Sequence, residues 1–130
     1  MSEKDRRQLL RMLEESYVLD MYVPHGASAM SSDFHPEFRI LIPSFDGRSG
    51  QITDVAWLKP NPSRSPSPKG IQPDQRFTMA VLDITGKVAV GKVEAIRDGR
   101  LQYTDYVTFV KIDHEWKIVS KAFHQHASVD

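Results

Sequence analysis

The first 22 residues carry apolar side chains at steps of three and four, on one face of a predicted helix. These positions are Leu9, Leu10, Leu13, Tyr17 and Met21. Charged residues such as Arg7 and Arg11 fall on the opposite face. Ser2 is a favourable N-cap, and Asp5 follows it three residues later. The pattern predicts an amphipathic helix over residues 2–22 with one buried stripe.

From Gln75 onward, the pattern changes to runs rich in β-branched and aromatic residues. The four runs are RFTMAVLDI, VAVGKVEAI, LQYTDYVTFVKI and WKIVSKAFHQH. The breaks between them, TGK, RDGR and DHE, are short turn signals that force neighbouring strands to be antiparallel. A helix followed by a four-stranded meander is the α+β pattern.

Between these parts, the sequence predicts shorter elements. EFRILIP is an apolar strand, SGQI a short partner for it, and GASAMSSDF one or two helical turns. TDVAWLK, with Thr53 as a capping residue, is expected to form a short helix. Residues 60–70 are rich in proline and serine, and we expect a mobile loop there that could act as a lid. One domain, 1–130, contains all of these elements.

The longest strand is apolar on both faces. Tyr103, Val107 and Phe109 share one face, whereas Tyr106 and Val110 share the other. A sheet that is apolar on both sides is usually covered on both sides, and the helices can cover only one. We therefore expect a homodimer that forms through the free face of the sheet.

Composition narrows the function classes. The chain has 130 residues, with 17 Lys plus Arg against 17 Asp plus Glu, so nothing indicates a nucleic-acid surface. It has no cysteine, which excludes disulfides and thiolate chemistry. No apolar run reaches the length of a membrane span, so no membrane partner is expected and a cytoplasmic location is the default expectation.

Two motifs resemble those of a known superfamily. SDFHPEFRI is similar to the "FHP" segment of nuclear-transport-factor-2-like proteins, and YTDYVTFVKIDHEWKIVSKAFH is similar to their C-terminal ending. Asp113-His114 stands where that ending usually has Asp-Gly. The group it resembles most is the putative lumazine-binding one, near the SnoaL-like polyketide cyclases.

The resemblance implies a cone-shaped, curved antiparallel sheet wrapped around N-terminal helices, the cystatin-like roll, with an internal pocket. It implies a small-molecule-binding protein whose ligand is apolar or aromatic. A cofactor-free isomerase, dehydratase or polyketide-cyclase-like lyase is one alternative, and a dimerisation or accessory domain with a vestigial pocket is another. Enzymes of this superfamily move protons with a buried aspartate or histidine and with tyrosine hydroxyls, so no cofactor or metal is expected.

Asp105 and His124 are the candidate catalytic residues. Asp105 lies between apolar neighbours on the longest strand, where a carboxylate needs either a partner such as Lys121 or a role in a pocket. His124 corresponds to a histidine of the resembled ending and could shuttle protons. His124 and His126 could also bind a metal, but a metal site needs three or more converging ligands.

The candidate ligand-binding residues come from several elements. They are Tyr17, His35, Trp57, Tyr103, Tyr106 and Lys121. The aromatic residues on predicted helices could simply be core, and His35 beside a proline could anchor the turn through backbone hydrogen bonds. Tyr106 is adjacent to Asp105 in sequence, so simple alternation places it on the other face of the strand.

Overall fold

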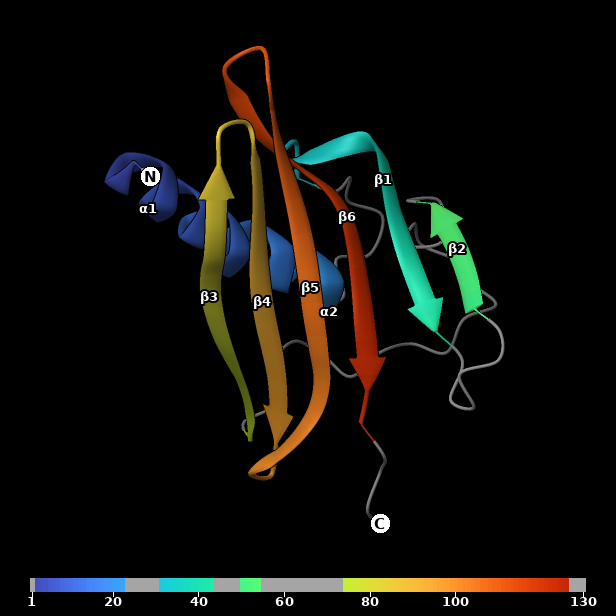
Figure 1. Cartoon of the computed structure of the whole chain (residues 1–130). Helices are drawn as coiled ribbons and strands as arrows, with labels where there is room; N and C mark the ends of the chain where they lie inside the picture. Colours follow the sequence, from blue (N-terminus) through green and yellow to red (C-terminus); the bar gives the residue numbers. More distant parts are fainter. Residues whose placement is uncertain (1, 23–30, 44–49, 55–73, 127–130) are drawn as a thin grey trace.

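A computed structural model describes residues 2–22, 31–43, 50–54 and 74–126 of the chain. Within them, one helical segment crosses one face of a six-stranded sheet (Figure 1). The strands are β1 (Phe34–Pro43), β2 (Gly50–Asp54), β3 (Gln75–Thr85), β4 (Val88–Arg97), β5 (Arg100–Ile112) and β6 (Glu115–Gln125). They lie in the order β2-β1-β6-β5-β4-β3.

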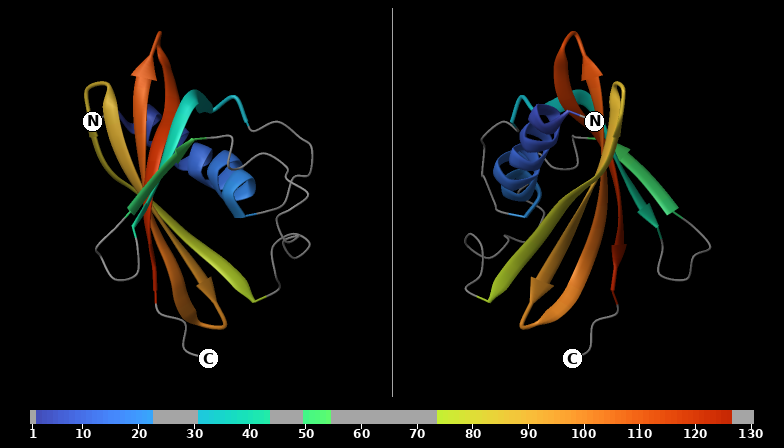
Figure 2. Two further views of the ribbon diagram at one scale, coloured as in Figure 1. Left: turned by 90° about the vertical axis from the view of Figure 1, so that its right-hand side faces the viewer. Right: turned by 60° about the vertical axis from the view of Figure 1, so that its left-hand side comes forward.

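The predicted meander is confirmed, because β3, β4, β5 and β6 pair antiparallel in sequence order. β1 extends this sheet by pairing parallel to β6, and β2 returns antiparallel to β1. The strands twist and curve so that the helical segment lies on the concave side (Figure 2). This is the α+β cone fold that the sequence predicts.

Two-residue turns close the meander. Asp98 and Gly99 both have positive φ, as do Asp113 and His114, which is the geometry that type I′ hairpins require. Aspartate and histidine are among the non-glycine residues that tolerate this region best. The unusual Asp113-His114 turn therefore closes the last hairpin, even though a side chain replaces the usual glycine.

The N-terminal helix runs as α1 (Glu3–Arg11), a π-helical turn, η1 (Met12–Tyr17), and α2 (Val18–Tyr22). The Ser2 hydroxyl accepts a hydrogen bond from the Asp5 N–H at 3.3 Å, which confirms the predicted N-cap. Leu9, Leu13 and Tyr17 are buried as predicted. π-helical turns are uncommon and often lie at functional sites.

The first turn of the helix contacts the sheet near the hairpin that joins β5 and β6. The Asp5 carboxylate accepts from the Trp116 indole at 3.1 Å and lies 3.7 Å from the Lys111 ammonium. The Arg6 guanidinium donates to the Val81 carbonyl at 2.9 Å. These contacts set the angle at which the helix crosses the strands, and they leave its C-terminal end over the middle of β5 and β6.

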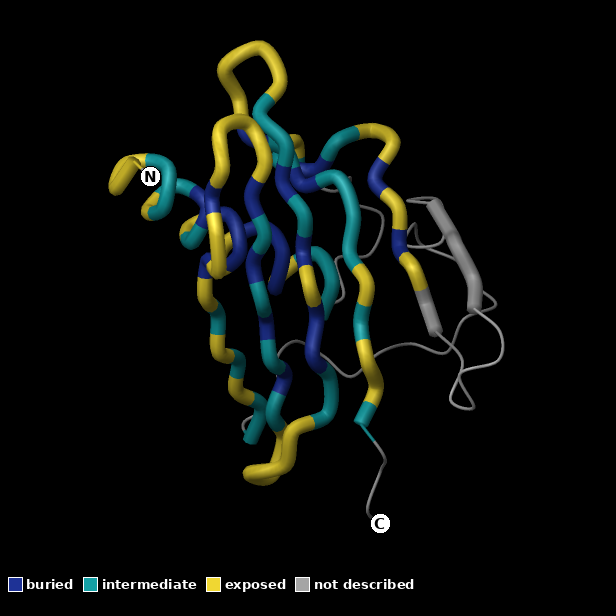
Figure 3. Tube along the Cα trace, in the orientation of Figure 1, coloured by how far each residue is buried: buried dark blue, intermediate teal, exposed yellow. Residues whose placement is uncertain are grey.

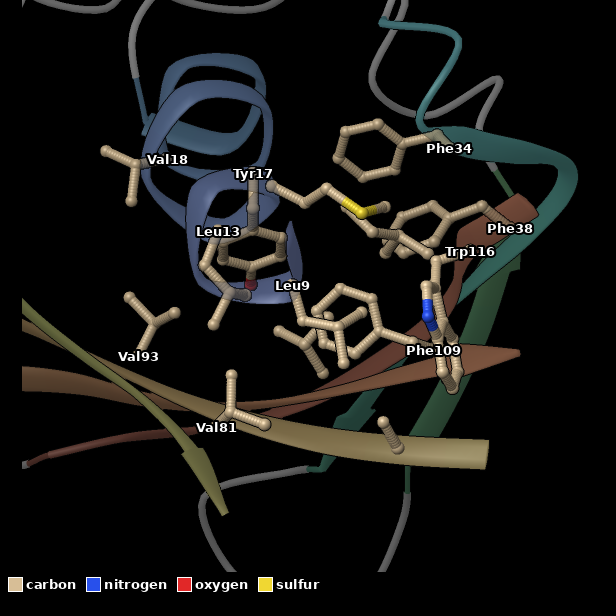
Figure 4. Packing of buried hydrophobic residues seen from close by; sticks show 14 of the residues in the cluster. Leu9, Leu13, Tyr17, Val18, Phe34, Phe38, Val81, Val93, Phe109 and Trp116 are labelled. Carbon is tan, nitrogen blue, oxygen red and sulfur yellow. The ribbon is translucent and has the colours of Figure 1, made fainter. Parts of the chain in front are cut away.

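The core fills the space between the helix and the concave face. Figure 4 shows Leu9, Leu13 and Tyr17 pointing from the helix towards Val81, Val93 and Phe109. Burial alternates along β4 and along β5 from Asp105 to Phe109, with the buried positions dark blue in Figure 3. Gly91 allows the closest approach, because a Cβ there would lie 2.9 Å from Leu13 Cδ1.

Some sequence predictions are wrong or lie outside the described residues. Thr53 lies in β2 opposite Ile40 and does not cap a helix at that point. β1 begins at Phe34, so the FHP segment is the start of the strand, with a register shift before Arg39. The predicted helical turns in 26–34 are not confirmed where the chain is described, because residues 32 and 33 form a turn and β1 starts at Phe34. The remainder of that segment, the rest of the TDVAWLK segment and the loop 60–70 lie outside the described residues.

Candidate functional site

Asp105 is the centre of a buried polar cluster on the concave face. It lies in the middle of β5, directly opposite Val93 on β4 and Phe123 on β6, and it is fully buried. Two tyrosines of the helical segment donate to the same carboxylate oxygen, Oδ2. The Tyr17 hydroxyl lies 2.6 Å away and the Tyr22 hydroxyl 2.7 Å away.

Lys121 completes this cluster from β6. Its Nζ lies 3.9 Å from Asp105 Oδ2, and its side chain is 11% exposed. The ammonium also faces three aromatic rings, at 5.5 Å from the centroid of Tyr17, 5.7 Å from Tyr22 and 4.9 Å from Phe123. We call Asp105, Tyr17, Tyr22 and Lys121 the Asp105 cluster.

A bulge in β6 puts Lys121 on this face. Ile118 pairs with Phe109 and Ser120 with Thr108, so Val119 is an extra residue without a partner on β5. Because side chains alternate along a strand, one extra residue reverses the faces of all later positions. Lys121 and Phe123 therefore face Asp105, whereas His124 faces away from it.

The other oxygen of Asp105 has no partner among the described residues. Oδ1 is buried and accepts no hydrogen bond from any described residue. A buried carboxylate oxygen without a donor is costly, and few such groups occur in folded proteins. The Asp105 cluster thus retains one buried acceptor that no described residue satisfies.

Burial and the carboxylate perturb the neighbouring groups. Burial, and then the negative charge of Asp105, raise the pKa of Tyr17 and of Tyr22 well above their usual value. Burial lowers the pKa of Lys121, and the attraction of Asp105 offsets only part of this effect. The two hydroxyls therefore stay protonated and remain donors, while the lysine loses its proton more easily than a free lysine does.

Four half-buried aromatic side chains border the cluster, and we call Tyr22, Phe77, Tyr103 and Phe123 the aromatic rim. The ring of Tyr22 lies 5.0 Å from that of Phe77 and 6.2 Å from that of Tyr103. Tyr103 in turn lies 6.0 Å from Phe123. These spacings are typical of tilted and edge-to-face aromatic pairs, so the rings provide apolar surface near the carboxylate.

A second polar network holds the C-terminal half of the helix in place. The Ser16 hydroxyl donates to the Asp33 carboxylate, and Asp20 accepts from the Ser31 N–H at 2.8 Å. The Asp33 carbonyl accepts from the Ile118 N–H at 2.8 Å. Because Tyr17 and Tyr22 lie on this part of the helix, the network fixes the position of both hydroxyls over β5.

The structure brings together four of the predicted site residues, Tyr17, Tyr103, Asp105 and Lys121. His124 and Tyr106 lie on the opposite, convex face of the sheet and are exposed. They therefore do not share a site with Asp105. His35 is half-buried on β1, and its Nδ1 accepts from the Glu37 N–H at 3.0 Å, the turn-anchoring contact that the sequence allows. Trp57 lies outside the described residues.

The two C-terminal histidines form a pair on the convex face. Their rings meet edge to face at 4.8 Å, and His126 Nε2 lies 2.8 Å from the Thr104 hydroxyl. Among the described residues, no group of three or more His, Asp or Glu side chains converges to bind a metal. The pair is thus a surface contact of β6 with β5.

Tyr22 was missed in the sequence analysis. The predicted stripe continued from Tyr17 to Met21, four residues on, and Tyr22 falls beside that stripe. Its long side chain nevertheless reaches Asp105 from the last turn of α2. The available signal was chemical: an aspartate within an apolar strand needs donors, and a tyrosine near a helix end can supply one.

Comparison with known proteins identifies the family. The family described as "Putative lumazine-binding" matches residues 5–124, nearly the whole chain. The chain belongs to this family. A search among curated proteins found no match. Among the described helices of this family member, none has the length and apolar character that a membrane span requires.

Three solved structures are similar over almost their full length. All are NTF2-like proteins of unknown function. The one from Methylobacillus flagellatus KT has 23% identity and a TM-score of 0.67, with 98% of this chain and 96% of that chain covered. The one from Shewanella baltica OS155 has 18% identity and a TM-score of 0.65, covering 98% and 99%. The one from Silicibacter pomeroyi DSS-3 has 17% identity and a TM-score of 0.60, covering 97% and 100%. At these identities, the similarity shows the NTF2-like fold alone.

Proposed function

We propose that this protein binds a small, flat, apolar or aromatic molecule at the Asp105 cluster, and that the ligand donates a hydrogen bond to Asp105 Oδ1. The unpartnered oxygen is the observation that carries this proposal. A ligand donor at Oδ1 would remove the cost of leaving a buried acceptor unsatisfied. The aromatic rim supplies apolar surface for the body of the ligand, as small-molecule sites usually do.

The polar groups of the cluster also define what the ligand should carry. Oδ1 requires an N–H or O–H donor on the ligand, and the ammonium of Lys121 favours a ligand carbonyl or another acceptor nearby. Flat heterocycles and aromatic amides have a donor and an acceptor side by side. Lumazine has both groups, and the description of the family makes it a natural member of a test panel.

We expect flat compounds of this type, represented by lumazine and benzamide, to raise the melting temperature. A ligand at roughly ten times its dissociation constant should raise Tm by about 3–5 °C. Thermal-shift measurements should show that Asp105→Asn loses this rise and that Tyr103→Leu, which shortens the aromatic rim, reduces it. Asp83→Asn, on an exposed part of β3, is the matched control and should respond like the unmodified chain. A panel of flat compounds that leaves Tm unchanged would overturn the proposal.

A cofactor-free acid–base enzyme is the second candidate, and the same free oxygen favours it. Asp105 Oδ1 could take a proton next to a substrate carbonyl, because its other oxygen is already held by two hydroxyls. In this role Asp105 would be the base, with Tyr17 and Tyr22 positioning it. The hydroxyls of both tyrosines are committed to Asp105, so a substrate oxyanion would have to be stabilised by Lys121.

We further propose that two copies associate through the convex face of the sheet. The helical segment covers only the concave face, and apolar side chains remain exposed on the convex face or at its edges. Tyr106, which is 46% exposed, lies near the middle of this face. Light scattering at micromolar concentration should give a dimer mass, and Tyr106→Glu should reduce it to that of a monomer. A monomer mass for the unmodified chain would contradict this proposal.

A further inference from the structure

Lys121 combines three properties that a structural ion pair does not require. Its side chain is nearly buried, its Nζ faces three aromatic rings, and its carboxylate partner lies 3.9 Å away, beyond hydrogen-bond distance. No described residue accepts a hydrogen bond from Nζ. The amine is therefore held in place by surrounding rings while its donor and lone-pair positions stay uncommitted.

Burial of Nζ makes the neutral amine easier to reach than it is for a free lysine. Burial lowers the pKa of Lys121 by more than Asp105 restores. Only a neutral amine has the lone pair that attacks a carbonyl carbon, and desolvation in an apolar site is a known way to activate a lysine nucleophile. Tyr17 and Tyr22 compete with the lysine for Asp105 Oδ2, since both hydroxyls already donate to that oxygen.

We propose that Lys121 is a nucleophilic amine that forms a reversible imine with a carbonyl-bearing ligand bound at the Asp105 cluster. This inference rests on the proposed function and names the ligand class as aldehydes and ketones with a flat apolar body. The aromatic rim would hold that body, and Asp105, once drawn closer to Nζ than its present 3.9 Å, would carry protons between Nζ and the carbonyl oxygen.

The reaction balances without another reactant. Asp105 first takes one proton from the Lys121 ammonium, and the nitrogen lone pair then forms a bond to the carbonyl carbon while the C=O π electrons move to oxygen. A second proton moves from nitrogen to that oxygen, which gives a carbinolamine. The nitrogen lone pair next expels the hydroxyl group, which leaves as water with the proton held by Asp105. Ammonium and carbonyl thus become a protonated imine and water, the nitrogen is neutral while Asp105 holds the proton, and Asp105 is a carboxylate again at the end.

Reductive trapping tests this inference directly. The intact protein is incubated with benzaldehyde and cyanoborohydride near neutral pH, and the modified lysines are identified by peptide mass mapping. Lys117 is the internal reference, because it lies on the same strand but faces the convex side and donates to the Ser32 carbonyl. We expect the Lys121 adduct to form severalfold faster than the Lys117 adduct, because a lowered pKa leaves more of Lys121 as the neutral amine at a given pH.

Two variants and one inert ligand separate the outcomes. Lys121→Arg keeps the charge and should lose only the fast adduct, and Asp105→Asn should slow trapping at Lys121 without changing it at Lys117. Benzamide, whose carbonyl does not form imines under these conditions, should compete with benzaldehyde at Lys121. Labelling of Lys121 no faster than Lys117 would overturn the inference. A benzamide-dependent rise in Tm in that same case would leave the binding proposal standing, whereas its absence would reject both.

Discussion

Asp105→Ala is expected to lower the free energy of unfolding by about 3–5 kcal/mol, the range for removing one partner of a buried charged pair. The change leaves the buried hydroxyl of Tyr17 without an acceptor and the ammonium of Lys121 without a counter-charge. Each group then bears its desolvation cost alone. Chemical denaturation, analysed by linear extrapolation, measures the loss.

Two further aspartate variants make this result interpretable. Asp105→Asn keeps one oxygen that can accept from both tyrosines, although it loses the charge and turns the other oxygen into an NH2 donor, so its loss should be smaller than that of the alanine variant. Asp83→Ala removes an exposed carboxylate that accepts a hydrogen bond from the Thr85 hydroxyl, and it should change stability by less than about 0.5 kcal/mol. If Asp105→Ala were as stable as Asp83→Ala, the cluster would not be part of what holds the helix on the sheet.

The meander was predictable from sequence because its signals are local. Each hairpin is predicted by a turn sequence, such as Asp98-Gly99, between two runs of strand-forming residues. The helix was predictable for the same reason, since Ser2 and the spacing of Leu9 and Leu13 mark its start and its buried face. The chemistry of Asp105 was also foreseeable in part, because an isolated carboxylate among apolar neighbours needs a partner, and Lys121 was named as one.

The faces of β6 could not be predicted from alternation alone. Trp116 and Ile118 are buried on the concave side, so strict alternation would place His124 there as well. The bulge at Val119 reverses the order, which moves His124 outward and Lys121 inward. A bulge depends on how two strands fit together over their whole length, and no residue of β6 signals it. The parallel pairing of β1 with β6 is long-range in the same sense.

Raising the pH above about 10, the usual pKa of tyrosine, is expected to destabilise the fold through Tyr17 and Tyr22. The pKa of each hydroxyl is raised in the folded state, so the unfolded chain loses these protons first. Their contribution to stability is therefore complete below about pH 10 and is lost progressively above it. Two such groups should cost about 2.7 kcal/mol per pH unit, because one proton corresponds to about 1.4 kcal/mol per unit.

Lys121 changes the stability of the fold in the opposite direction, and it does so at lower pH than the tyrosines. Its pKa is lowered in the folded state, so the unfolded chain binds the extra proton and stability rises with pH until the free lysine also titrates. The cluster should therefore contribute most to stability just below the pH at which free tyrosine ionises. Urea unfolding at a series of pH values, at constant ionic strength, measures both limbs of this dependence.

Single tyrosine variants test whether the loss of stability at high pH comes from the Asp105 cluster. Tyr22→Phe keeps the ring contacts with Phe77 and Tyr103 and removes one of the two hydroxyls, so it should remove about half of the slope, roughly 1.4 kcal/mol per pH unit. Tyr106→Phe deletes the same atom from the convex face, where it does not touch Asp105, and should leave the slope as in the unmodified chain. Equal slopes for both variants would mean that alkaline unfolding begins elsewhere in the protein.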